Sequence, residues 1–139
     1  MVDRGLILKK LAVLEEYRDQ LREFETLTVA AYQADWKVQR IVERTLQMMI
    51  ELCADIAGHI IADRRLRTPE TYADSFRVLG ENSLLNPEQA SVMEKMAKFR
   101  NIVVHQYDAV DAEIVILILQ KHLDDFDRFR DAMITCLRQ

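Results

Sequence analysis

The sequence contains very few of the residues that interrupt helices: its 139 positions include only 3 glycines and 2 prolines. A β-sandwich or β-barrel needs a turn about every 8–12 residues, and so few turn-forming residues do not supply them. Half of the chain is hydrophobic, which excludes a disordered protein. The length is that of about one domain. The sequence therefore predicts a single all-α domain covering residues 1–139.

Five helical segments follow from start and stop signals. The first, residues 4–32, has apolar side chains at alternating spacings of three and four, as one buried helix face requires. Asp35 is the predicted N-cap of the second, residues 36–62, which is apolar around most of its circumference. A helix of this kind must be covered on several sides. It is therefore either central in a bundle or in contact with a second copy of the chain.

Two further helix starts are marked by proline. Thr-Pro-Glu at 68–70 and Asn-Pro-Glu at 86–88 each combine an N-cap, a proline at the first helical position and an acid in the first turn. The first opens a short helix that stops near Gly80, and the second opens a helix through Phe99. The last helix starts near Asp111. These lengths predict an antiparallel four-helix bundle with one extra short helix in its longest connection.

Charge and cysteine content narrow the classes of function. With 19 basic and 23 acidic residues the net charge is −4, so nucleic-acid binding requires a local basic patch. Cys53 and Cys136 form neither a disulfide framework nor a metal-ligand cluster, and we expect both in the core. The longest aliphatic run, residues 114–119, is too short for a membrane span, and residues 1–5 do not begin a signal peptide. We expect a soluble cytoplasmic protein.

Functional groups concentrate in residues 99–108, at the predicted end of the fourth helix. Arg100, His105 and Tyr107 place a fixed cation, an imidazole and a phenol within eight residues. On a continuous helix Arg100 and Tyr107 lie nearly on one face, whereas Arg100 and His105 are about 140° apart. Either the helix ends before His105, or the arginine that meets it comes from another protomer. Asn101, four residues before His105, is placed to hydrogen-bond its ring.

Structural explanations compete with chemical ones at several positions. The 99–108 segment also fits a plain helix terminus with a capping histidine and an exposed arginine. Asp55, His59 and Asp63 have the spacing of a partial metal site, but three ligands in line on one helix surround an ion poorly. A polar seam with His59 oriented by Asp55 is the favoured interpretation. His122 is expected as a partly buried bundle residue.

The segment resembles the Arg-x4-His-x-Tyr motif of the HepT family. These HEPN-superfamily toxins are encoded beside MntA, a minimal nucleotidyltransferase antitoxin. Here the motif consists of Arg100, His105 and Tyr107. Residues 51–62 are similar to the central helix of the family, and residues 68–80 to its short helix. The order of helices matches over nearly the whole chain.

The resemblance implies a metal-independent endoribonuclease that acts on cellular RNA, with tRNA among the candidate substrates. RNA carries its own nucleophile, the 2′-hydroxyl, on which His105 would act as general base, or else as general acid at the leaving oxygen. Arg100 would hold the phosphate and stabilise its developing charge. The HEPN precedent is a homodimer with two motifs facing one cleft. It requires neither a cofactor nor a metal ion.

The same resemblance implies regulation at Tyr107. The nucleotidyltransferase would transfer AMP from ATP onto this phenol, and the added phosphate and base would oppose RNA binding beside Arg100. Without the resemblance, packing of Tyr107 in the turn before the last helix is an equal alternative.

Two questions stay open at the level of sequence. Lys95 and Lys98 adjoin the motif, so they either contact RNA or form part of a solvated face. The alternative to an enzyme is a non-catalytic helical module, in which Arg100 and His105 bind nucleotide phosphate and the chain partners a minimal nucleotidyltransferase. Cleavage of RNA by the purified protein discriminates the two.

Overall fold

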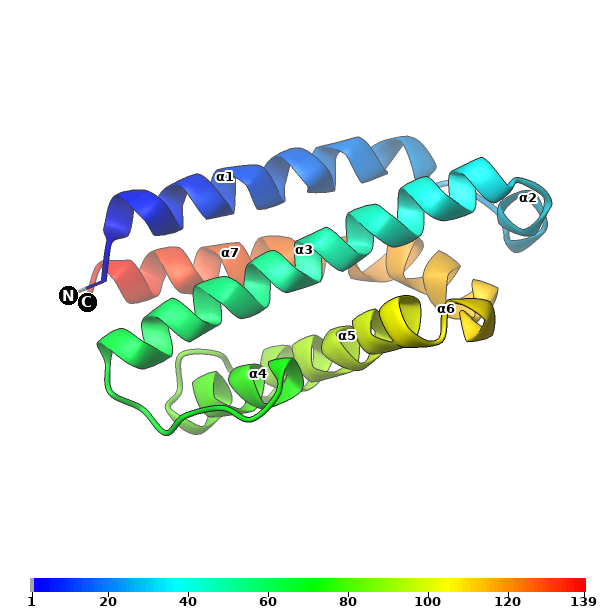
Figure 1. Cartoon of the computed structure of the whole chain (residues 1–139). Coiled ribbons are helices and arrows are strands. Elements are labelled where there is room, and N and C mark those ends of the chain that lie inside the picture. Colours follow the sequence, from blue (N-terminus) through cyan, green and yellow to red (C-terminus); the bar gives the residue numbers. More distant parts are fainter. Residues whose placement is uncertain (1) are drawn as a thin grey trace.

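The computed structural model describes residues 2–139, and over that range the regular structure is entirely helical. Long helices run alternately up and down the bundle (Figure 1). They are α1 (Arg4–Leu21), α3 (Trp36–Asp63), α5 (Pro87–His105) and the pair α6 (Ala112–Leu117) and α7 (Leu123–Leu137). The predicted all-α antiparallel four-helix bundle is confirmed. The extra short helix, α4 (Tyr72–Glu81), lies in the connection between α3 and α5, as predicted.

Helix α3 is central in this bundle. It packs against α1, α4 and α5, and its buried residues extend from Val42 to Ile61. By length and composition alone α3 passes for a membrane span, but 56% of its most apolar window is buried inside the bundle. Of the two explanations for its apolar circumference, the central position in the bundle is therefore the one that the structure supports. Cys53 on α3 and Cys136 on α7 are both buried and unpaired, as expected, and burial raises the pKa of each thiol.

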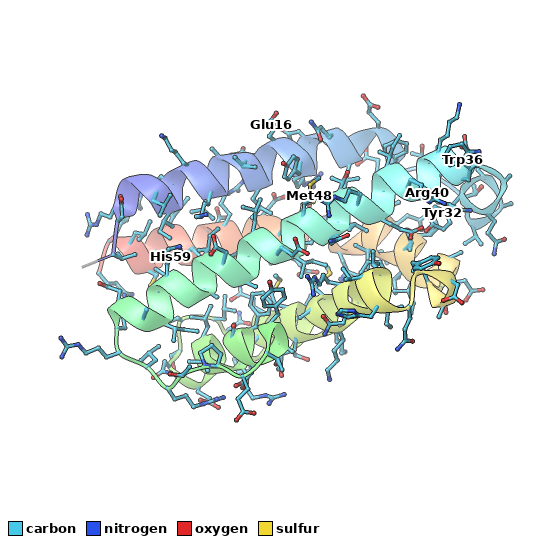
Figure 2. The ribbon with its side chains drawn as sticks, in the orientation of Figure 1. Glu16, Tyr32, Trp36, Arg40, Met48 and His59 are labelled. Atoms are coloured by element: carbon cyan, nitrogen blue, oxygen red, sulfur yellow. The ribbon has the colours of Figure 1, made fainter. Side chains whose placement is uncertain are left out.

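The predicted first helix, residues 4–32, is wrong beyond Leu21. A short 3-10 turn, η1 (Arg22–Phe24), follows α1, and a separate helix, α2 (Val29–Ala34), crosses the end of the bundle. The Thr28 hydroxyl accepts a hydrogen bond from the Ala31 N–H at 3.1 Å, so it caps α2 and favours a new start over continuation. The Tyr32 hydroxyl of α2 donates to the Glu43 carboxylate on the second turn of α3, and Tyr32 lies at this end of the bundle (Figure 2).

The remaining helix starts agree with the sequence in three of four cases. Asp35, Asn86 and Asp111 cap α3, α5 and α6, and Asn86 forms a full capping box with Gln89. The start predicted at 68–70 is wrong, because Thr71 caps α4 and the helix begins at Tyr72. A π-helical segment, η3 (Ile118–His122), interrupts the last helix, which the sequence pattern does not signal. A 3-10 turn, η2 (Tyr107–Ala109), follows α5.

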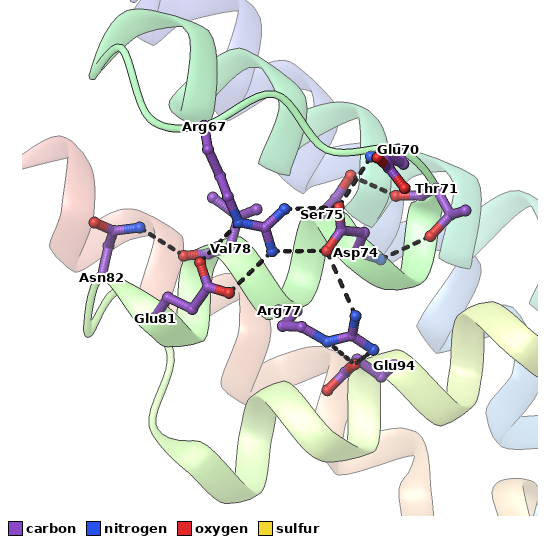
Figure 3. Close-up of polar contacts among 10 residues, drawn as sticks. All are labelled: Arg67, Glu70, Thr71, Asp74, Ser75, Arg77, Val78, Glu81, Asn82 and Glu94. Atoms are coloured by element: carbon purple, nitrogen blue, oxygen red, sulfur yellow. Dashed lines mark hydrogen bonds and ion pairs between the residues drawn. The ribbon is translucent and has the colours of Figure 1, made fainter.

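A salt-bridge network fastens α4 and explains the displaced start. Asp74 accepts from both terminal nitrogens of Arg67, at 2.9 and 2.7 Å, and from the Glu70 N–H at 3.0 Å (Figure 3). These bonds hold residues 67–71 as a turn in front of the helix. Asp74 also lies 3.7 Å from Arg77, which pairs with Glu94 of α5 at 2.7 Å (Figure 3). Arg67, in the connection after α3, is thus part of the scaffold.

Candidate active site

Three helices converge on Arg100. This residue lies on α5, and its Nε and Nη2 donate to Glu51 Oε1 of α3 at 3.0 and 2.8 Å. Its guanidinium carbon is 4.8 Å from the ring centroid of Tyr72, the first residue of α4. The Arg100 side chain is 17% exposed. Its position is therefore set by α3 and α4 as well as by its own helix, while one part of the guanidinium still reaches solvent.

Glu51 is the site residue that sequence reasoning missed. Its Oε1 also accepts from Gln47 Nε2 at 3.0 Å, so three N–H groups meet on one oxygen. Burial favours a higher pKa for Glu51, but the hydrogen bonds from Gln47 and Arg100 and the charges of Arg100 and Arg44 together hold it below its ordinary value. The available signal was a single carboxylate inside the apolar run 48–54.

Asn101 contacts Arg100 and not His105. Its Oδ1 accepts from Arg100 Nη1 at 3.2 Å, and over residues 2–139 no hydrogen bond joins it to the His105 ring. The predicted support of the imidazole by Asn101 is therefore corrected. The reason is competition: the neighbouring guanidinium is a charged donor, and it takes the amide oxygen.

His105 is the last residue of α5, and its side chain is exposed. Because α5 is helical through His105, the alternative in which the helix ends before this residue is wrong. Arg100 and His105 therefore project in different directions from one regular helix. Convergence of the two groups through a second protomer stays a prediction.

Tyr107 lies beyond the helix, in η2, and is 77% exposed. The prediction that it shares one face of a continuous helix with Arg100 is wrong, because α5 ends two residues earlier with Gln106 as C-cap. Its hydroxyl is nevertheless open to a partner protein. The three motif residues thus lie toward one end of α5 in different settings. Arg100 is held by neighbouring side chains, His105 is exposed at the last position of the helix, and Tyr107 is exposed beyond it.

A groove of about 560 Å³ runs between α3 and the start of α4, next to Arg100. Glu51 and Tyr72, which hold Arg100, also line this groove. Asp55, Gly58 and His59 continue it along α3. A Cβ atom added at Gly58 would meet nothing within 4 Å, so the groove is open above the helix at this point.

The other histidines fit the structural explanations. Asp55 forms an ion pair with Lys10 at 2.6 Å, and His59 Nε2 lies 3.6 Å from its other oxygen, which agrees with a polar seam. His122 is partly buried, as predicted, with Nδ1 2.8 Å from Asp125. Within residues 2–139, no group of three or more His, Cys, Asp or Glu is placed to hold a metal ion.

Lys95 and Lys98 are exposed on α5, and neither forms an ion pair within the described part of the chain. Lys95 borders a separate apolar groove of about 240 Å³ against α6, which includes the half-exposed Ile114 and Leu117. Contact of either lysine with RNA stays a prediction.

Sequence comparison connects the chain to ribonucleases. Residues 14–133 match the model of the family described as Ribonuclease HepT-like. The chain is 31% identical to the mRNA nuclease HepT of Shewanella oneidensis, over 92% of this chain and 96% of that protein. It is 29% identical to the tRNA nuclease HepT of Aphanizomenon flos-aquae, over 90% of this chain and 85% of that protein.

Solved structures agree in fold over nearly the full length. The tri-AMPylated HEPN toxin of Shewanella oneidensis, in complex with MNT antitoxin, superposes with a TM-score of 0.88 at 30% identity. The match covers 96% of this chain and 99% of that one. The cytosolic protein YutE of Bacillus subtilis shares the fold, with a TM-score of 0.81 at 22% identity, over 99% of this chain and 92% of that one.

Proposed function

The chain belongs to the HepT-like ribonuclease family of HEPN toxins, and we propose that it is the toxin of a two-gene toxin–antitoxin system, an endoribonuclease that works without a metal ion. The observation that carries this proposal is the setting of Arg100. A cation fixed by Glu51 beside an open groove, with an exposed imidazole at the end of the same helix, supplies the two groups that RNA cleavage needs. We also propose that residues 1–139 form one HepT-like domain, active in the cytoplasm.

The chemistry follows from the two side chains and from the substrate. His105 takes the proton of the 2′-hydroxyl, whose oxygen then attacks the adjacent phosphorus. The bond to the 5′-oxygen breaks, and a protonated imidazole returns a proton to that oxygen. The products are a 2′,3′-cyclic phosphate and a 5′-hydroxyl. Arg100 uses Nε, Nη1 and Nη2 in three internal bonds, so two of its five N–H groups are left for the phosphate oxygens.

A homodimer is part of the proposal, because Arg100 and His105 diverge on α5. Two chains that face each other can bring the arginine of one to the histidine of the other. Ile41 on α3, an aliphatic side chain that is 51% exposed, offers an apolar surface for such a contact. Sedimentation at micromolar concentration measures the assembly. A monomer that still cleaves RNA contradicts this part of the proposal.

The deciding experiment incubates purified, unmodified protein with total RNA in the presence of a chelator. Discrete cleavage that disappears in a folded His105→Ala variant supports the ribonuclease. Cleavage that requires added magnesium contradicts the metal-free mechanism. Absence of cleavage together with retained nucleotide binding supports the non-catalytic module that partners a nucleotidyltransferase. The relatives act on mRNA and tRNA by name, so both RNA classes serve as substrates in this assay.

Regulation at Tyr107 completes the proposal. An MntA-like nucleotidyltransferase joins the phenolic oxygen to the α-phosphate of ATP, and pyrophosphate leaves. The 77% exposed ring lies two residues beyond His105, so the added phosphate and base oppose RNA binding at the site. The related Shewanella toxin is tri-AMPylated, which supports the same reaction here.

Intact mass after co-expression with the neighbouring nucleotidyltransferase tests this step. We expect gains of whole AMP units in the parent protein and in Tyr17→Phe, and none in Tyr107→Phe. If Tyr107→Phe is neutralised as fully as the parent protein, modification of this residue is not the antidote.

A further inference from the structure

Trp36, at the start of α3, is the only tryptophan in the chain and is 62% exposed. Large aromatic rings are normally covered, so an open indole marks a contact surface. Two cations lie against the ring: Lys37 Nζ is 5.8 Å and Arg40 Cζ is 5.6 Å from its centroid. Trp36 and Arg40 lie together at the α2 end of α3 (Figure 2).

The cations around this tryptophan are not neutralised by a carboxylate in direct contact within the described residues. Lys37, Arg40 and Arg44 form no ion pair with any residue in the described range 2–139. Arg18, Arg67 and Arg77, in contrast, each pair with two carboxylates. Three free cations beside an open aromatic ring, in a chain of net charge −4, form a local basic patch of the kind that anion binding requires.

The patch leads to the candidate active site. Trp36, Arg40 and Arg44 are spaced by four residues and lie on one face of α3, and Glu51 lies on the same face two turns further on. The rise of a helix places Trp36 about 22 Å from Glu51 along its axis. Arg44 is near enough to help lower the pKa of Glu51, the carboxylate that holds Arg100.

We propose that Trp36, Lys37, Arg40 and Arg44 form a platform that binds single-stranded RNA and guides it along α3 toward Arg100. A base stacks on the exposed indole, and the three cations bind the phosphates before and after it. Stacking on an aromatic ring combined with a positively charged track is the general solution for unpaired RNA. The proposal rests on the ribonuclease function proposed above, and it adds a binding surface outside the motif.

Because Trp36 is the only tryptophan in the chain, its intrinsic fluorescence reports on this surface alone. Binding is measured with a 2′-O-methyl oligouridylate, which lacks the free nucleophile and therefore separates affinity from cleavage. We expect the oligonucleotide to quench the fluorescence of Trp36. In Trp36→Ala, affinity for a labelled oligonucleotide, followed by anisotropy, falls about fivefold to tenfold, and Trp36→Phe restores part of it.

The cations are tested by salt dependence. For the double variant Arg40→Gln/Arg44→Gln, we expect the slope of log affinity against log salt to become shallower by about 1.4, the value for two lost phosphate contacts with a single strand. The matched control is Lys9→Gln/Arg138→Gln, which removes two exposed cations, one from the first half of α1 and one from the end of α7, and keeps the parent slope.

The outcomes separate this proposal from the ribonuclease itself. Cleavage by the parent protein with unchanged affinity and quenching in all platform variants overturns the platform and leaves the enzyme intact. Trp36-dependent binding without any cleavage supports the platform and overturns the enzyme. Altered sedimentation of Trp36→Ala with unchanged RNA affinity identifies the surface as a protein interface and overturns the platform.

Discussion

Two arginines of this bundle, Arg67 and Arg100, are each held by carboxylates from elsewhere in the fold, but to different degrees. Arg67 donates four hydrogen bonds to two carboxylates, Asp74 and Glu81 (Figure 3). Arg100 donates two bonds to a single oxygen of Glu51 and one to the neutral Asn101. Arg67 thus uses four of its five N–H groups on two carboxylates, whereas Arg100 uses three and has only one carboxylate partner, so it keeps more donors and more of its charge for a ligand.

One residue type can therefore serve either the scaffold or the site, according to how many of its N–H groups the protein occupies. Around Arg67 the carboxylates outnumber the cation, so a further anion is repelled. Around Arg100 one carboxylate fixes the direction of the guanidinium without occupying its whole edge, and the Tyr72 ring covers one face. An arginine whose N–H donors and charge are only partly taken up by the protein is thus a candidate phosphate ligand, whereas one surrounded by carboxylates is structural.

The largest expected effect compares alanine at the two arginines. Arg100→Ala lowers the rate of RNA cleavage about a hundredfold or more, because the phosphate loses its charged donor in the transition state. Its melting temperature falls too, because the partly buried Glu51 loses its charged partner, so the cleavage rate is compared on folded molecules. Arg67→Ala lowers the melting temperature and keeps the cleavage rate of the folded molecules. Cleavage rates and thermal scans on both variants measure the contrast, and equal loss of activity in both contradicts it.

A finer comparison exchanges each carboxylate for its amide. In Glu51→Gln the neutral oxygen still accepts from Arg100 but orients it less firmly, and we expect kcat to fall about tenfold with little change in stability. For Asp74→Asn, in contrast, we expect a lower free energy of unfolding and an unchanged kcat. Steady-state kinetics beside urea unfolding separate the two. A Glu51→Gln protein with parental kcat removes Glu51 from the positioning of Arg100.

The acid dependence of stability sharpens the same contrast. The hydrogen bonds from Arg67 and from the Glu70 N–H lower the pKa of Asp74 from 3.8 to about 2. A depressed pKa contributes stability that is present above pH 4 and is lost as the pH falls toward 2. The stability difference between the parent and Asp74→Asn is therefore constant above pH 5 and shrinks below pH 4. Urea unfolding across this range measures it, and a difference that grows on acidification contradicts the assignment.

The smallest expected effects come from two helical glycines beside these regions. Gly58 lines the open groove, where an added Cβ meets nothing, so Gly58→Ala stabilises the protein by about 0.5–1 kcal/mol. At Gly80 on α4 the same atom would lie 2.8 Å from the Ala90 side chain of α5. We expect Gly80→Ala to destabilise by about 1–3 kcal/mol through overpacking. Changes of opposite sign in the free energy of unfolding, measured with urea, confirm that the groove is open at Gly58 and that α4 and α5 are in close contact at Gly80.

Elements whose signals are local can be predicted from the sequence. The caps at Asp35, Asn86 and Asp111 and the apolar spacing of α3 act within a few residues, and they predict the bundle and its order. The break after Leu21 and the start at Thr71 were missed, because threonine caps compete with continued helix. That competition is decided by packing across the ends of the bundle.

The motif was visible for the same reason: Arg100, His105 and Tyr107 lie within eight positions of one another. The residues that hold Arg100, in contrast, are brought to it by the packing of the helices. Glu51 is 49 residues away along the chain and Tyr72 is 28, so no spacing rule connects either of them to Arg100. Hydrogen bonds and ring contacts are short-range forces, and they act between whichever residues the packed helices bring together. The free donors of Arg100 are a consequence of that packing.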